Sequence, residues 1–396
     1  EFSLTSDTVG THQGFIRIQG EDNLAADDVR YFTFDVRPPF PVLIAAPNPV
    51  ARYTFFLPRA LAPPLFQKTG RARFQCETIG IDKLLDKNLD GYAAVCLLDP
   101  TPLDVASWQR LRTYVEGGGG LGIWLGHNAQ PDTSFTDPAA LALLPGKLDQ
   151  LVPSAAPISD AERTKLKIAI SPTNDDLQHP VMAIFRSNAR SIHWDRLKIW
   201  RHWTFRDLDK AANVVLHFND RQPAVLETAV GKGRVLAMTT PISDPADDPV
   251  FWNQLPTGFD IIPTFVLSNE MVLYLAGSGE ERLNYAAGDR ATLRIEANPT
   301  QSKFSLLNPQ QGEGIDLTFD QKSNSIHVPN TATAAAGNYQ VQAGGSEGGV
   351  RRGFSMNVPA AATSLARIKK EELTALLGAG RFKLAHGREE IDRSVS

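Results

Sequence analysis

The sequence has few cysteines, no strong charge imbalance and no long apolar run, and each absence removes a class of protein. Its 396 residues include only two cysteines, Cys76 and Cys96, too few for a disulfide framework or a cysteine-based zinc site. The net charge of −4 gives no electrostatic reason to expect nucleic acid as a partner. No apolar run approaches the roughly 20 residues that a membrane helix needs, and no signal peptide is present. Because the chain starts at Glu1 and not at methionine, we expect a piece of a longer protein or a chain whose leader was removed.

What the sequence does contain is enough apolar material for folded domains. Hydrophobic residues make up 42% and charged residues 21% of the chain, as in ordinary globular proteins. A length of 396 residues suggests two or three domains. We therefore expect a folded, multidomain protein without long disordered segments.

The stretch 104–130 organises the rest of the chain. Val105, Trp108, Leu111 and Val115 recur at helical spacing, and the glycines from Gly117 onward favour the left-handed turn that ends a helix. The run 121–125 is apolar without alternation, which is typical of a strand buried on both faces. The pattern predicts one helix-to-strand step of a doubly wound sheet.

Alternation of this kind continues on both sides of that stretch. Strands are predicted at 42–46, 72–79, 92–98 and 121–125, with helical segments between them. Strands that alternate with helices form parallel sheets, and we expect the flavodoxin-like order 2-1-3-4. That order brings Ala46, Asp99 and Gly126 to neighbouring carboxyl ends, where ligands bind in such sheets.

The predicted domain boundaries follow changes in composition. Residues 1–38 carry two alternating strand signals, which are either the last hairpin of a β-sandwich or an edge hairpin on the next domain. The α/β domain spans 39–280. Short strands with frequent turns predict a small β-sandwich over 281–359, and 360–396 reads as a helix and a charged tail.

The segment Gly122-Ile123-Trp124-Leu125-Gly126 closely resembles the GICLG elbow of class I glutamine amidotransferases. The resemblance implies an amidotransferase-like fold over about 40–280, with the nucleophilic cysteine of the family replaced by Trp124. An indole offers no atom for a covalent acyl intermediate. The His-Pro-Glu of the family is also missing, since Val181 follows His179-Pro180. The resemblance therefore implies the fold without glutaminase activity.

Other residues with possible chemistry have simpler interpretations. Cys76 and Cys96 lie within predicted strands and read as small core residues with inert thiols. Asp99, His127, Asp132 and His179 could gather as metal ligands, but polar loop residues explain them better. We interpret four tryptophans as core packing, with a carbohydrate-binding shelf as the alternative: Trp194, Trp200, Trp203 and Trp252.

A second resemblance covers nearly the whole chain. The segment 22–28, the strand 42–44, the run 231–236 and the strand 354–358 resemble aerotolerance-type bacterial membrane proteins. This resemblance implies an extracytoplasmic (periplasmic) stretch, anchored to a membrane by segments outside the chain, with other envelope proteins as partners.

Two functions remain after these steps. The first is a non-catalytic binding or scaffolding module, because the amidotransferase nucleophile is missing. The second is a hydrolase that uses Asp99 and His127. In either case the candidate ligand site is Asp99, Gly126, His127 and Asn128. No catalytic residue is assigned under the first hypothesis, and no metal or other cofactor is expected.

Overall fold

A computed structural model gives the fold of the chain. The residues that the structure describes are 6, 8–20, 24, 27–133, 135–154, 159–189, 191–242, 251–258, 261–277, 282–295, 303–309, 314–320, 325–343, 350–363 and 368–385. Most of the segment 22–28 and most of the charged tail lie outside them.

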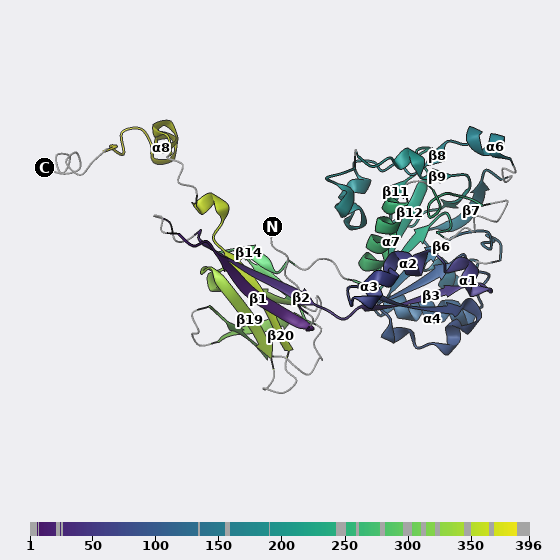
Figure 1. Cartoon of the computed structure of the whole chain (residues 1–396), viewed down its shortest axis with the longest axis horizontal. Helices are drawn as coiled ribbons and strands as arrows, with labels where there is room; N and C mark the ends of the chain where they lie inside the picture. Colours follow the sequence, from purple (N-terminus) through teal and green to yellow (C-terminus); the bar gives the residue numbers. More distant parts are fainter. Residues whose placement is uncertain are drawn as a thin grey trace. The chain divides into compact units, whose positions relative to one another are not determined.

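The chain divides into two compact units. The α/β unit is Arg37–Glu280, and the β unit combines Glu1–Val36 with Glu281–Ser396 (Figure 1). The α/β unit is therefore inserted between two parts of the β unit.

The strands of the α/β unit are β3 (Phe40–Ala46), β4 (Phe74–Gly80), β5 (Ala94–Leu98), β6 (Gly120–Trp124), β7 (Lys147–Val152), β8 (Ile168–Ala169), β9 (Lys198–Ile199), β10 (His202–Arg206), β11 (Ala212–His217), β12 (Pro223–Val230) and β13 (Gly233–Met238). The α-helices are α1 (Val50–Tyr53), α2 (Leu57–Leu61), α3 (Pro64–Lys68), α4 (Val105–Glu116), α5 (Pro138–Leu141), α6 (Asp160–Lys165) and α7 (Ile262–Leu275). Short 3-10 helices are η1 (Ile81–Asp86), η2 (Leu89–Gly91), η3 (Asp176–Gln178), η4 (Pro180–Phe185) and η5 (Trp194–Arg196).

A seven-stranded sheet with the order β11-β12-β13-β6-β5-β3-β4 forms the centre of this unit. The strands β4, β3, β5, β6 and β13 are parallel, and β12 and β11 add an antiparallel hairpin. The first four strands along the chain thus have the order 2-1-3-4, and the prediction of this order and of an α/β class is confirmed.

Hydrophobic cores cover both faces of the sheet. Val42 and Cys96 point to the face that carries α2, η4 and α7, while Leu43 and Leu97 point to the face that carries α4 and α5. This alternation explains why these strands read as continuous apolar runs, because both of their faces are buried.

Helix α4 begins and ends close to the predicted positions. The Asp104 carboxylate accepts a hydrogen bond from the N–H of Ser107 at 2.7 Å, which caps the amino end. Trp108, Leu111 and Val115 are buried as the helical spacing predicts. The positive φ after the helix falls on Gly118 (120°), whereas Gly117 keeps a right-handed conformation.

Two predicted elements are split in the structure. The sequence predicts one helix at 53–61, whereas the structure has α1, which ends at Tyr53, and α2, which has Pro58 in its first turn. The β-rich run 198–205 predicts one strand, whereas the structure has β9, which pairs with β8, and β10, which pairs with β7.

The β unit is built from β1 (Gly10–Arg17), β2 (Val29–Val36), β14 (Asn284–Ala286), β15 (Ala291–Arg294), β16 (Lys303–Leu307), β17 (Ile315–Asp320), β18 (Ser325–Val328), β19 (Gly337–Ala343) and β20 (Val350–Asn357), with η6 (Asn330–Ala332), η7 (Ala360–Thr363) and α8 (Lys370–Leu377). Its seven strands from β14 to β20 follow the order β14-β20-β19-β16-β17-β18-β15 around one core.

The hairpin β1–β2 packs on this sheet across β19 and β20 (Figure 1). The Asn357 side chain pairs with Tyr31, accepting from its N–H at 2.8 Å and donating to its carbonyl at 2.9 Å. Asn284 forms the same pair of bonds with Thr33, both at 2.9 Å. The sequence analysis separated the hairpin from the sandwich, but these side-chain bonds join them in one unit.

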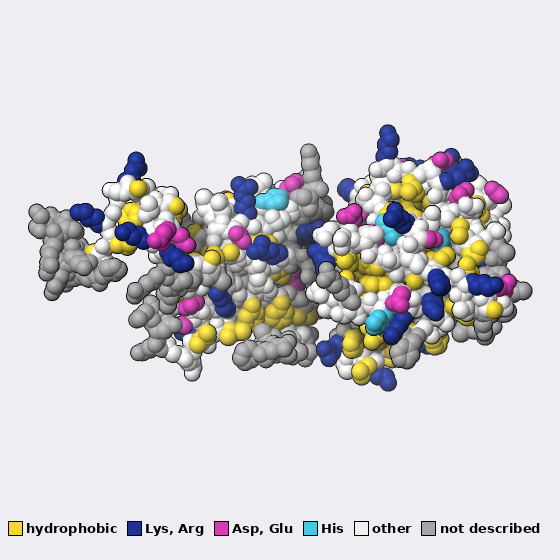
Figure 2. Space-filling view, turned by 90° about the horizontal axis from the view of Figure 1, so that it is seen from above, with side chains coloured by type: hydrophobic (Ala, Val, Ile, Leu, Met, Phe, Trp, Pro, Cys, Tyr) yellow, Lys and Arg dark blue, Asp and Glu magenta, His cyan; other side chains and the backbone are white. Residues whose placement is uncertain are grey.

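Charges of both signs are interspersed on the face drawn in Figure 2. Within the described residues, no helix is long and apolar enough to cross a membrane.

Candidate functional site

The predicted site lies where β5 and β6 end. Asp99 follows β5 directly, with a left-handed backbone (φ 45°), and donates its N–H to the carbonyl of Trp124 at 2.8 Å. Only 3% of Asp99 is exposed. A buried carboxylate needs hydrogen-bond donors, so its partners decide what it can do.

The main described partner of Asp99 is Asn128. Asp99 Oδ1 accepts from the Asn128 N–H at 2.8 Å, and Oδ2 accepts from Asn128 Nδ2 at 3.0 Å. Gly126 packs directly against Asp99, because a Cβ built on this glycine would come within 2.6 Å of the Asp99 carboxyl group. Asp99, Gly126 and Asn128 therefore lie close together, as the predicted strand order requires. Their contacts are with one another, and the hydrogen bonds between Asp99 and Asn128 close the turn after β6.

Aromatic side chains cover the rest of this edge. Trp203 donates its indole N–H to the carbonyl of Gly126 at 2.9 Å. The exposed His127 ring lies against Trp252, with centroids 4.7 Å apart. The part of the edge above β6 is therefore lined by its own indole rings.

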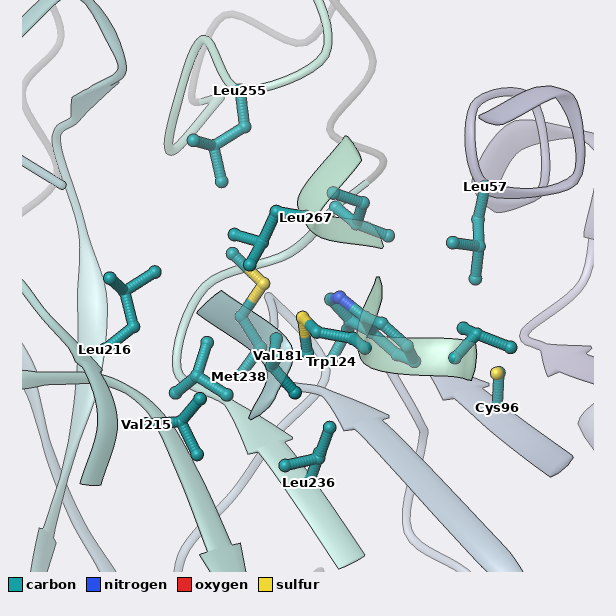
Figure 3. Packing of buried hydrophobic residues seen from close by; sticks show 14 of the residues in the cluster. Leu57, Cys96, Trp124, Val181, Val215, Leu216, Leu236, Met238, Leu255 and Leu267 are labelled. Atoms are coloured by element: carbon teal, nitrogen blue, oxygen red, sulfur yellow. The ribbon is translucent and has the colours of Figure 1, made fainter. Parts of the chain in front are cut away.

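Trp124 points away from this edge into the core. It is fully buried on the face that carries α7, among Cys96, Met238 and Leu267 (Figure 3). A Cβ on Gly122 would approach the Trp124 ring to 2.5 Å, so this glycine makes room for the indole. Both glycines of the GIWLG segment are thus explained by packing.

The remaining parts of the amidotransferase constellation are also absent. Among the described residues between β6 and α5 no helix follows the strand, so the strand-turn-helix elbow does not form. His179 is hydrogen bonded through Nε2 to Glu227 at 3.2 Å, on β12, two strands away from β6.

The two thiols are unpaired, with Cys96 buried in β5 and Cys76 half-buried in β4. Burial raises the pKa of Cys76 to about 12 and raises that of Cys96 as well. A thiol attacks as the thiolate, so neither residue is suited to replace the missing nucleophile. The predicted core position is confirmed for Cys96, whereas Cys76 is only partly buried against the same core.

The suggested metal ligands do not converge. Asp99 pairs with Asn128, and His179 pairs with Glu227. Nowhere in the described part of the chain do three His, Cys, Asp or Glu side chains form a group that could hold a metal ion.

A hollow of about 510 Å³ lies elsewhere in the α/β unit and was not predicted. We call it the Trp194 hollow; its lining residues are Arg163, Thr164, Leu166, Lys167, Ile168, Ala169, Ile170, Ser171, Trp194, Asp195, Lys198 and Asn219. Trp200, Trp203 and Trp252 are core residues as predicted, while Trp194 is only half-buried. The sequence feature that could have indicated this hollow is a cluster of basic residues around two short β segments. Composition alone does not distinguish this cluster from other basic residues.

Comparisons with known proteins give no family. No family model matches the chain, and no curated protein sequence matches it. Similar solved structures include a cytoplasmic protein from Salmonella typhimurium, at 13% identity and a TM-score of 0.39, over 66% of this chain and 94% of that one. A putative ThuA-like protein from Bacteroides uniformis matches at 14% identity and a TM-score of 0.39, over 60% of this chain and 93% of that one. A β-galactosidase from Halorubrum lacusprofundi matches at 14% identity and a TM-score of 0.36, over 74% of this chain but only 40% of its own.

These findings correct the recognition made from the sequence. The assignment to a class I amidotransferase domain within an aerotolerance-type membrane protein is wrong: no family model and no curated protein sequence supports it. Short motifs such as GIWLG misled the assignment because packing around Trp124 and Asp99 produces the same glycine spacing.

Proposed function

We propose that the chain is a non-catalytic binding module, in which the α/β unit holds a ligand or a partner and the β unit is a scaffold. The observation that carries this proposal is the fate of Trp124 and Asp99. The first is a core side chain where the amidotransferase pattern has its nucleophile, and the second is engaged by Asn128. Neither position offers an accessible reactive atom.

A flavodoxin-like sheet is part of this proposal. The parallel strands β4, β3, β5, β6 and β13 have the order 2-1-3-4-5 when numbered along the chain, which is the flavodoxin-like order. This order, together with the buried Trp124 at the end of β6, supports a flavodoxin-like binding module without a nucleophile there. The extracytoplasmic location and the envelope partners stay predictions.

The second function, a hydrolase using Asp99 and His127, has less support. A general base must reach the proton that it removes, and the Asp99 carboxylate already accepts two hydrogen bonds from Asn128. His127 is exposed beside Trp252.

A turnover assay tests the proposal. The full chain is incubated with glutamine and, separately, with p-nitrophenyl acetate, and released ammonia or nitrophenol is measured. We expect no product above the rate of an Asp99→Asn, Cys96→Ala variant. Ammonia release that Cys96→Ala abolishes, or ester hydrolysis that His127→Ala abolishes, would show that the chain is an enzyme.

A ligand screen by thermal shift tests the predicted binding site at Asp99, Gly126, His127 and Asn128. A ligand at 100 times its Kd stabilises a fold by about 2.7 kcal/mol. His127→Ala is the informative variant, because its ring is exposed, whereas Asn128→Ala removes a side-chain hydrogen bond to the buried Asp99. A hit whose shift persists in His127→Ala does not use this imidazole.

A further inference from the structure

We propose that the Trp194 hollow binds a phosphomonoester that carries a ring, of the nucleoside monophosphate or sugar phosphate kind. This inference deepens the proposed function and rests on it in one respect, namely that the ligand is held without being converted. It starts from where the hollow lies in the sheet.

The hollow is at the carboxyl end of the edge strand β11. Since β11 is antiparallel to β12, which is antiparallel to β13, β11 runs in the same direction as β6. Asn219 lies just beyond the end of β11 and lines the hollow. The hollow is therefore on the edge of the sheet where ligands of α/β proteins bind, but beside a strand at the end of the sheet.

One face of the β8–β9 ribbon forms a small floor with two basic side chains. Ala169 is paired with Lys198 across the ribbon, and Lys167 is two residues before Ala169. Residues two apart in a strand, and directly opposed residues, share a face. Lys198 therefore lies on the Ala169 face of the ribbon, and Lys167, directly before β8, lines the same hollow.

Asn219 holds this floor in place. Its Oδ1 accepts from the N–H of Ala169 at 3.2 Å, and its Nδ2 donates to the carbonyl of Lys167 at 2.6 Å. The N–H of Asn219 also donates to the carbonyl of Ala169 at 3.0 Å. The backbone that carries Lys167 is thus fixed before any ligand arrives, which lowers the entropy cost of binding.

The charge of the lining matches a phosphomonoester. Arg163, Lys167 and Lys198 line the hollow together with one carboxylate, Asp195, so the lining has two net positive charges. The Arg163 guanidinium already lies 4.2 Å from the centre of the Phe251 ring, so the two lysines are the phosphate ligands. A phosphomonoester carries about −1.5 to −2 at neutral pH. In the described part of the chain neither lysine forms an ion pair, and lysine is a common phosphate ligand.

Trp194 supplies an aromatic wall for the ring. Its indole N–H is already used, donating to the carbonyl of Ala189 at 3.2 Å, and its edge contacts Phe185 with centroids 5.2 Å apart. These contacts fix the ring, which is half-buried and lines the hollow. A volume of about 510 Å³ is within the usual range for small-molecule sites.

A second hollow, of about 400 Å³ in the β unit, is less suited to an anion. Its lining includes Arg351 and Arg352, but Arg352 pairs with Asp35 at 2.7 Å and Arg351 donates to Gln340 at 2.7 Å. The arginines there are already engaged.

Isothermal titration calorimetry with the full chain tests the proposal. Adenosine 5′-monophosphate and glucose 6-phosphate are the two ring-bearing phosphomonoesters, and adenosine and inorganic phosphate are the comparison ligands. We expect at least one phosphomonoester to bind with a Kd below about 1 mM, and the tighter of the two identifies the source of the ring. The comparison ligands should bind at least about tenfold more weakly. Failure of both phosphomonoesters, or equal binding of adenosine, would overturn the proposal.

Matched variants locate the site. Lys167→Ala, Lys198→Ala should weaken binding about tenfold, because both lysine contacts to the phosphate are removed. Lys68→Ala, Lys83→Ala removes the same charge from exposed positions outside the hollow and should leave the Kd unchanged. Equal weakening by both double variants, or none by the first, would contradict the assignment.

Two further readings separate this site from the proposed function. Quenching of tryptophan fluorescence by the ligand should disappear in Trp194→Phe. The ligand recovered after a day should be unchanged by mass spectrometry. Conversion of a bound ligand would refute the non-catalytic function and leave the site standing, whereas no binding would refute the site alone.

Discussion

At the scale of single residues, two glycines and a tryptophan decide how the GIWLG segment is to be interpreted. Gly122 gives space to the Trp124 ring, and Gly126 gives space to the Asp99 carboxyl group. Close packing therefore explains the glycines of the GIWLG segment. The sequence contains the spacing, but it does not contain the direction in which Trp124 points.

We expect Gly122→Ala to destabilise the α/β unit by about 1–3 kcal/mol, the usual cost of overpacking a core. Chemical denaturation followed by circular dichroism measures it. The same change in a Trp124→Leu background should cost less, because the atom that the new methyl group meets belongs to the indole. Equal costs in both backgrounds would show that the ring does not occupy this space.

The two cysteines give a second prediction at this scale. They lie on β4 and β5, which flank β3 and are about 9–10 Å apart at normal strand spacing. Cys76 is opposite Val42 and Cys96 is opposite Ile44, so the two thiols are also offset along the strands and beyond disulfide reach. Their raised pKa values leave little thiolate. We expect Ellman's reagent at pH 8 to find no rapidly reacting thiol in the native chain and two after denaturation without reductant. Fewer than two in the denatured chain would mean that a thiol is blocked.

At the scale of elements, a polar network ties α7 to the sheet. The hydroxyl of Tyr274 on α7 donates to Glu227 Oε1 at 2.7 Å, and the Arg234 guanidinium lies 4.2 Å from the centre of the Tyr274 ring. His179 Nδ1 accepts from the N–H of Val181, so its Nε2 carries the proton that is donated to Glu227. Burial alone would raise the pKa of Glu227, but the bonds from His179 and Tyr274 lower it.

This shift predicts a pH dependence of stability. A carboxyl group whose pKa is lowered by folding stabilises the fold above its unfolded pKa of about 4.3 and loses that contribution as the pH falls through the folded value. We expect Glu227→Gln to be less stable than the parent at pH 6. The difference should narrow as the pH falls from about 5 toward 3, in urea unfolding at each pH. A difference that stays constant with pH would show that Glu227 is not stabilised as the anion.

Tyr274→Phe is the companion variant, because it removes one donor and keeps the ring under Arg234. Loss of a hydrogen bond to a charged group costs about 1.5–3 kcal/mol.

Local sequence patterns predicted most elements of the α/β unit but did not predict the Trp194 hollow. The continuous apolar run at 94–98 and the helical spacing of Trp108 and Leu111 follow from burial, so the sequence shows them directly. The pairing of β10 with β7 and the position of Trp194 depend on contacts between distant segments. Periodicity contains no information on such contacts, so the hollow was not predicted.

At the scale of the whole molecule, the β unit is assembled from two segments that the α/β unit separates in the sequence. Tyr31 and Asn357 are 326 residues apart in sequence and joined by hydrogen bonds. Thr33 Oγ1 and Ser355 Oγ are 2.6 Å apart in the same interface. These segments are far apart in the sequence, and local patterns do not show that they pair. For this reason the hairpin was expected to be either the last hairpin of another sandwich or an edge hairpin on the next domain.

We expect a single proteolytic cut between about 276 and 284, where glycines gather, to leave both fragments associated. The hairpin stays bonded to the sandwich through Asn284 and Asn357, so the pieces should co-elute in native gel filtration and separate in urea. Asn357→Ala should weaken this association. Pieces that separate under native conditions would contradict the shared unit, and the absence of any cut would misplace the boundary.

The central claim is that the carboxyl edge above β5 and β6 is closed by its own side chains, and a double-mutant cycle on Asp99 and Asn128 tests it most directly. Asn128→Ala removes the side-chain amide that donates to Asp99 Oδ2 and keeps the backbone N–H that donates to Oδ1, so we expect a loss of about 1.5–3 kcal/mol in unfolding free energy. In an Asp99→Ala background the same change should cost much less, giving a coupling of at least about 1 kcal/mol. Additive costs would mean that the Asn128 amide does not hold the Asp99 carboxylate, and the edge would then have a carboxylate available for ligand or catalysis.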